Sequence, residues 1–172
     1  MYCVGHGRHS VKPRRGLGLL EKKVLANWRI CIIVPFIICK SEENPGPMSY
    51  KCIKIEGEYY YGKHLMMTAV GCNEALMDIP TMKQFLVSLS DDIGMVRFGD
   101  PIVERFGEGE QTGLSGVQLI TTSAITFHTN DQYRDFYLDV FSCKWFESSL
   151  VAEVVRTLFN PANITISDVL RQ

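Results

Sequence analysis

The chain has 172 residues, of which 46% are hydrophobic and 22% are charged, with a formal net charge of −1. Residues 1–47 carry 8 Lys and Arg against 3 Asp and Glu, a net of +5, whereas residues 48–172 carry 10 against 16, a net of −6. This length and composition indicate one soluble domain with a sizeable core. A domain with a net negative charge does not attract a polyanion, so nucleic acid is excluded as its partner.

The cysteine pattern argues against a metal site and against a disulfide scaffold. The six cysteines, at positions 3, 31, 39, 52, 72 and 143, form no Cys-x-x-Cys pair and have no His at zinc spacing. A domain of this size does not need disulfides to fold. We therefore expect reduced thiols and a cytoplasmic protein.

Residues 1–47 differ in composition from the rest of the chain and are expected to form a disordered or weakly structured N-terminal arm. The apolar run at 30–39 has ten residues and contains Pro35, so it is too short to span a membrane. Three interpretations remain open. The arm is a targeting or partner segment, it packs on the domain, or it is not translated, because Met48 opens the domain at 48–172.

The first half of this domain predicts a strand and a helix. Residues 59–71 alternate as a half-buried strand does. Asp78 is expected to cap a helix with Pro80 in its first turn and Gly94 at its end. Between them, apolar residues recur at helical spacing.

The second half predicts a strand at 95–106, broken near Gly99, and then an acidic, glycine-rich loop at 107–113. Two β-rich runs come next, at 117–127 and 136–141, with a turn at 130–132 between them.

A helix at 147–159 and a short strand at 164–169 complete the order β-α-β-β-β-α-β. The expected fold class is α+β, a two-layer sandwich with a mainly antiparallel sheet and both helices on one face.

Four chemically capable side chains fall within 29 positions of this second half: Ser115, Ser123, His128 and Cys143. Strands position side chains firmly, so such a set can be preorganised for catalysis. Taken one at a time, each residue is more typical of a structural role, as a strand serine, a hydrogen-bonded histidine or a packed cysteine.

The order and spacing of these four residues, together with motifs around them, resemble those of a known family. The matching motifs are Leu-Ser-Gly-Val at 114–117, Ser123, Phe-His-Thr at 127–129, Asp-Val-Phe-Ser-Cys at 139–143 and, upstream, Gly-Lys-His-Leu at 62–65 and Gly-Cys at 71–72. Through these motifs, the chain resembles the bacterial-type S-adenosylmethionine decarboxylase proenzymes over about residues 57–171.

The resemblance implies an enzyme that makes its own pyruvoyl cofactor from Ser123 by cleaving the chain between Thr122 and Ser123. Decarboxylation needs an electron sink that no side chain supplies, and the pyruvoyl ketone, joined to the substrate amine as a Schiff base, provides it. The family's roles carry over as a proton donor at Cys143, a processing base at His128 and an oxyanion donor at Ser115.

A continuous extended strand would place Ser115 roughly 26 Å from Ser123 and turn His128 to the opposite face. Either the chain bends sharply between them, or a second copy contributes these two residues. The family implies the second arrangement, a homodimer with shared active sites.

Three positions depart from the family pattern. Thr122 stands where the family usually has Glu, and Gln132 replaces a Glu expected to bind the ribose hydroxyls of the substrate. The aromatic residue expected to stack on adenine falls on Gly109, and Phe106, the nearest aromatic residue, would serve only if the loop is rearranged.

Three functions are compatible with these observations. The first is a decarboxylase of S-adenosylmethionine in spermidine and polyamine synthesis. The second keeps the chemistry but takes ornithine or arginine, whose cationic side chain would meet Glu108 and Glu110. The third is an unprocessed, inactive homologue that binds a partner subunit or ligand.

Overall fold

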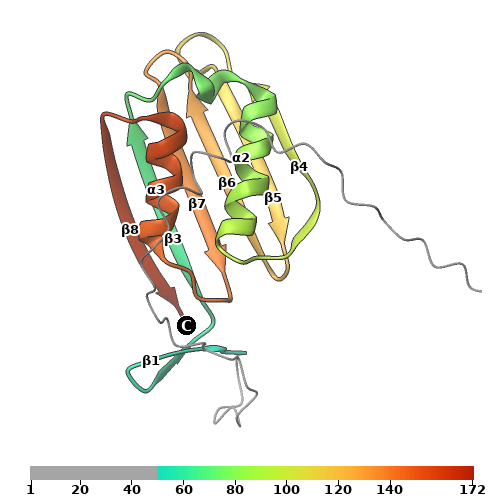
Figure 1. Ribbon diagram of the computed structural model, residues 1–172, viewed down its shortest axis with the longest axis vertical. Helices are drawn as coiled ribbons and strands as arrows, with labels where there is room; N and C mark the ends of the chain where they lie inside the picture. The colour runs from blue at the N-terminus through green and yellow to red at the C-terminus, as the bar shows by residue number, and fades with distance from the viewer. Residues whose placement is uncertain (1–49) are drawn as a thin grey trace, which may run out of the picture. The chain divides into compact units, whose positions relative to one another are not determined.

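The computed structural model describes residues 50–172, and the arm predicted at 1–47 lies outside them. The described part has a six-stranded sheet in the order β4-β5-β6-β7-β3-β8, in which every neighbouring pair is antiparallel. Both helices lie on one face of this sheet (Figure 1). The predicted α+β two-layer architecture is confirmed.

The main strands are β3 (Gly62–Val70), β4 (Arg97–Phe106), β5 (Gly113–Ile120), β6 (Ser123–Asn130), β7 (Asp135–Ser142) and β8 (Asn163–Arg171). A separate hairpin, β1 (Ile53–Ile55) and β2 (Glu58–Tyr60), precedes them. The helices are α2 (Ile79–Asp92) and α3 (Ser148–Phe159), with short 3-10 turns η2 (Glu74–Met77) and η3 (Gly109–Gln111).

Helix α2 begins and ends at the predicted residues. The Asp78 carboxylate accepts a hydrogen bond from the Thr81 amide at 2.9 Å and so caps the helix. The hydrogen bonds to Thr81 hold the pKa of Asp78 below its ordinary value. After the helix, Gly94 adopts a positive φ of 67°, which glycine tolerates without strain.

Helix α3 ends in a similar way, because Asn160 takes the left-handed conformation and Pro161 comes directly after it. Its apolar stripe, Val151, Ala152, Val155 and Phe159, is buried against the sheet. The predicted helix at 147–159 is confirmed to within one residue.

The core lies between the two helices and the sheet. Its centre is a cluster of four buried aromatic rings, Phe85, Phe127, Phe136 and Phe159, whose contacting centroids are 5.1–5.8 Å apart. Edge-to-face and tilted ring pairs at such distances add to the free energy of burial. This cluster fixes the middle of β6 and the start of β7 against both helices.

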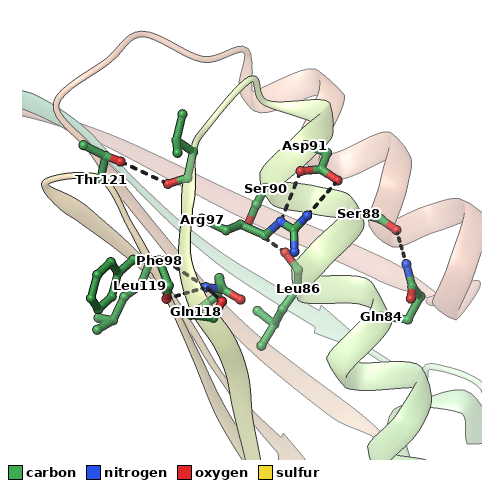
Figure 2. A network of polar contacts seen from close by, with 12 residues as sticks. Gln84, Leu86, Ser88, Ser90, Asp91, Arg97, Phe98, Gln118, Leu119 and Thr121 are labelled. Atoms are coloured by element: carbon green, nitrogen blue, oxygen red, sulfur yellow. Dashed lines mark hydrogen bonds and ion pairs between the residues drawn. The ribbon is translucent and has the colours of Figure 1, made fainter. Parts of the chain in front are cut away.

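Strand β4 is one strand with an irregularity, which explains the break predicted near Gly99. Its register with β5 shifts between Phe98 and Ile102. The buried Gln118 side chain of β5 stabilises the shift by donating to the Phe98 and Gly99 carbonyls, both at 3.3 Å. Figure 2 shows this contact beside the end of α2, where Arg97 pairs with Asp91 at 3.2 Å.

Two runs predicted as single strands are divided in the structure. The run at 59–71 is divided at Tyr61 between β2 and β3. The run at 117–127, taken as one strand, contains a two-residue turn at Thr121 and Thr122, and it is divided between β5 and β6. The main sheet therefore has six strands where the predicted order had five. Neither turn residue is Gly, Asn, Asp or Pro, so the local sequence carried no turn signal.

The face of the sheet opposite the helices is called the open face, because no described element covers it within residues 50–172. Apolar side chains on it include Met66, Leu119 and Tyr137, which are 37%, 51% and 42% exposed. In the same described part, no helix is long and apolar enough to cross a bilayer.

Candidate active site

The β5–β6 hairpin organises the candidate residues. Its strands pair from Ser115 opposite His128 to Ile120 opposite Ser123, and the turn at Thr121 and Thr122 closes the pairing. The Thr121 amide donates to the Val96 carbonyl at 2.8 Å, which anchors this turn to the segment between α2 and β4. Thr122 has a φ of +61°, a conformation rarely adopted by a β-branched residue.

At the turn, Cys143 contacts both residues of the Thr122–Ser123 peptide bond. The Cys143 amide donates to the Ser123 hydroxyl oxygen at 3.0 Å. The Cys143 thiol lies 2.7 Å from the Thr122 hydroxyl. Three of the residues predicted to serve cleavage and catalysis are therefore in direct contact at one end of the sheet.

The other predicted pair lies on the open face. The Ser115 hydroxyl is 2.8 Å from Nδ1 of His128, and the two residues face each other across β5 and β6. If the hydroxyl donates to Nδ1, the histidine carries its proton on Nε2. The pair is exposed, so its imidazole is accessible from outside this chain.

These two groups do not meet within one chain. Ser115–His128 and Ile120–Ser123 are five residue steps apart along the hairpin, which corresponds to roughly 17 Å at about 3.4 Å per residue. The alternation of β6, with Ile125 and Phe127 buried and His128 exposed, places His128 on the open face. A sharp bend of the chain after Ser115 is one of the two arrangements that the sequence allows, and the β5–β6 turn is such a bend. It brings Ser115 next to His128, but it leaves both residues far from Ser123.

The predicted substrate-binding residues lie at the same end of the hairpin as His128. Phe106 ends β4 opposite Gly113 and is 59% exposed. Gln132 is exposed in the β6–β7 turn. This turn is tied to the acidic loop because the Asn130 side chain donates to the Glu110 carbonyl at 2.6 Å.

Three features of the site could not be read from the sequence. The contact of the Thr122 hydroxyl with Cys143 results from the unpredicted turn. The Cys52 thiol, 91 positions away in the chain, donates to the Cys143 carbonyl at 2.7 Å. Glu104 and Tyr137 flank Ser115 and His128 in the sheet register, and only a correct strand alignment would have revealed them.

The pKa values of Cys72 and Tyr137 are both raised, by burial first and by Asp135 second. Burial, with a smaller contribution from Asp135, raises the pKa of Cys72 to about 11, so this thiol is protonated and packs in the core. Partial burial, followed by the charge and hydrogen bond of Asp135, raises the pKa of Tyr137 beside His128.

Among residues 50–172 no cluster of three His, Cys, Asp or Glu side chains is arranged to hold a metal ion.

Comparison with known proteins identifies the family. The model of the family described as S-adenosylmethionine decarboxylase matches residues 63–172, which include nearly all of β3, all of β4 to β8 and every residue of the candidate site except Cys52. The chain belongs to the S-adenosylmethionine decarboxylase family. The family resemblance drawn from the motifs is thereby confirmed.

Individual relatives of the family are distant. An S-adenosylmethionine decarboxylase proenzyme from Thermodesulfovibrio yellowstonii is 35% identical over 86 residues, which are 49% of this chain and 61% of that protein. An arginine decarboxylase proenzyme from Caldivirga maquilingensis is 27% identical over 104 residues, 60% of this chain and 75% of that protein.

A solved structure shares the fold. The crystal structure of the adenosylmethionine decarboxylase from Aquifex aeolicus superposes with a TM-score of 0.55, at 18% identity, covering 65% of this chain and 91% of that one. This likeness concerns the fold alone.

The structure explains the glycine of the family motif at 114–117 and leads to a first testable prediction. A Cβ atom on Gly116 would lie 2.3 Å from the Phe127 ring. The Gly116→Ala change is therefore expected to push this core ring aside and to lower the free energy of unfolding by about 1–3 kcal/mol.

Chemical denaturation measures this loss. Gly99→Ala is a poor control because Gly99 has a positive φ, so the exposed Ser167→Ala on β8 is preferred. Equal stabilities of Gly116→Ala and the wild type would show that Phe127 does not constrain β5.

Proposed function

We propose that this protein is a self-processing, pyruvoyl-dependent decarboxylase. The observation that carries the proposal is the contact of Cys143 with both Thr122 and Ser123, at the peptide bond where the motif places cleavage. Family membership supports the same chemistry, because relatives named as decarboxylases are also named as proenzymes.

In the processing step, the Ser123 hydroxyl attacks the Thr122 carbonyl carbon, a C–O bond forms, and the C–N bond breaks to leave an ester. Removal of the Ser123 Cα proton then breaks the Cβ–O bond, which releases a carboxylate on Thr122. Water then hydrolyses the unsaturated residue at the new N-terminus to a ketone, and its nitrogen leaves as ammonia. His128 is suited to take the proton, and Ser115 to stabilise the oxyanion.

The residues present fit the group that this step makes. Ser123 is the first residue of β6, it is partly exposed at the end of the sheet, and its oxygen is already held by the Cys143 amide. When formed, the pyruvoyl group supplies a carbonyl that binds the substrate amine and draws electrons from the bond to the leaving carboxylate. In this proposal the Cys143 thiol returns a proton to the substrate carbon.

A second copy of the chain completes the site in this proposal. Ser115 and His128 lie on the open face, roughly 17 Å from Ser123 of the same chain. The open face also exposes Met66, Leu119 and Tyr137, apolar surface that a partner sheet would remove from water. A homodimer with shared active sites accounts for both features. We keep the cytoplasm as the proposed compartment because Cys143 acts there as a reduced thiol.

Self-cleavage is the first test. Intact mass of the purified protein is expected to show fragments 1–122 and 123–172, with the second lighter by one ammonia because its serine has become a ketone. Ser123→Ala is expected to remain a single chain, while the matched Ser167→Ala cleaves like the wild type. A wild-type chain that stays whole after long incubation would overturn the pyruvoyl mechanism and favour the inactive homologue.

Sharing of the site between copies gives a separate prediction. His128→Ala and Ser123→Ala are each expected to stay uncleaved when expressed alone. When the two are co-expressed with different tags, only the His128→Ala chain should be cleaved, since its Ser123 then meets the partner's intact histidine. Absence of this complementation would place His128 and Ser123 in the same copy.

The proposed substrate is S-adenosylmethionine, with a basic amino acid as the second candidate. The second is favoured by the acidic side chains Glu104, Glu108 and Glu110, which are exposed on or beside β4. The Caldivirga relative, named for arginine, supports keeping it. Phe106 on the exposed end of β4 supports the first, because it can stack on a purine ring.

The Gln132→Glu change separates the two substrates. It restores a carboxylate for the ribose hydroxyls, and the stronger charged hydrogen bonds are expected to raise kcat/KM for S-adenosylmethionine about tenfold. Release of carbon dioxide from arginine and ornithine should not improve in the same variant. If the wild type decarboxylates only the amino acids, the S-adenosylmethionine proposal fails and the pyruvoyl chemistry stands.

A further inference from the structure

Thr122 has an unusual backbone at a sensitive position. Its φ of +61° lies in the left-handed region, where the branched Cβ of threonine is crowded, and glycine or asparagine would be the ordinary choice. The residue also carries the carbonyl carbon that Ser123 would attack. A left-handed residue of this kind persists only where surrounding contacts hold it.

The Thr122 hydroxyl makes two such contacts. It donates to the Thr121 carbonyl at 2.6 Å and lies 2.7 Å from the Cys143 thiol. The Cys143 amide holds the Ser123 hydroxyl at 3.0 Å. Cys143 therefore holds the two residues on either side of the scissile bond at the same time.

We propose that Thr122 is a positioning residue for self-processing. Its hydroxyl, through the Cys143 thiol, keeps the scissile carbonyl in the left-handed geometry that lets the Ser123 oxygen approach. The inference rests on the self-processing function proposed above and concerns only the first step. In that step a bond forms between the Ser123 hydroxyl oxygen and the Thr122 carbonyl carbon, and the bond from this carbon to the Ser123 nitrogen breaks. The hydroxyl proton passes to the leaving nitrogen, so no oxidant or other reactant is needed.

The contact also separates the two duties of Cys143. In the uncut chain the thiol is engaged by Thr122. After cleavage Thr122 becomes a chain end, and no following peptide bond restrains its backbone. The thiol is then available to the substrate. The family's usual Glu at this position has a longer side chain, whereas this chain carries a hydroxyl on Cβ.

The test measures the rate at which fragment 123–172 appears after a short pulse of cell-free synthesis, read by mass. Thr122→Val keeps the branched Cβ and removes the hydroxyl, and it is expected to cleave about tenfold more slowly. Thr122→Ser restores the hydroxyl and should return the rate to within about threefold of the wild type. Thr121→Val is the matched control, because the Thr121 hydroxyl bonds to the Val96 carbonyl, at 3.2 Å, rather than to the Cys143 thiol.

A double-mutant cycle assigns the effect to the contact itself. Cys143→Ala removes the other half of the pair, and the double variant with Thr122→Val is expected to cleave no more slowly than the slower single variant. A purely structural role would instead lower the stability of every variant without this non-additivity.

The outcomes are distinct. A folded Thr122→Val chain that cleaves at the wild-type rate, or losses that multiply in the double variant, would overturn the role of Thr122 and leave the proposed enzyme intact. A wild-type chain that never cleaves would overturn both. Circular dichroism verifies folding, and Thr122→Ala, which also lacks the hydroxyl, replaces Thr122→Val if that variant does not fold.

Discussion

The register of the β5–β6 hairpin is the constraint on which the rest of the site depends. Pairing of Ile120 with Ser123 closes the turn on the Thr122–Ser123 bond, and the same register sets Ser115 opposite His128. A slip of one residue would turn every side chain of a strand to the other face. Phe127, packed over Gly116 and against Phe136, prevents such a slip by locking β6 into the core.

The two faces of the sheet have different roles. The face that α2 and α3 cover (Figure 1) supplies stability, because the four-ring cluster is buried there. The open face carries the accessible Ser115–His128 pair and exposed apolar side chains. Rigid packing on one side therefore holds reactive groups on the other, which is how strands preorganise a site.

The two ends of the hairpin are also under different constraints: the end proposed for cleavage is called the scissile end, and the end proposed for substrate binding is called the binding end. At the scissile end, Thr122, Ser123 and Cys143 touch one another, so a substitution at any one of them is felt by the others. At the binding end, Gln132 and Phe106 are exposed. Such exposed positions tolerate change, so in the proposed enzyme the substrate preference can shift while the processing residues are kept.

The sequence by itself determined the helices, because their apolar period and stop residues are local. Its motifs also supplied the candidate residues of the site. It did not determine the turn at Thr121 and Thr122, whose conformation is imposed by contacts with Val96 and Cys143 that are distant in the chain. The contact of Ser115 with His128 was likewise decided by tertiary structure. Strand pairing is a non-local property, so only the assembled sheet shows which residues meet.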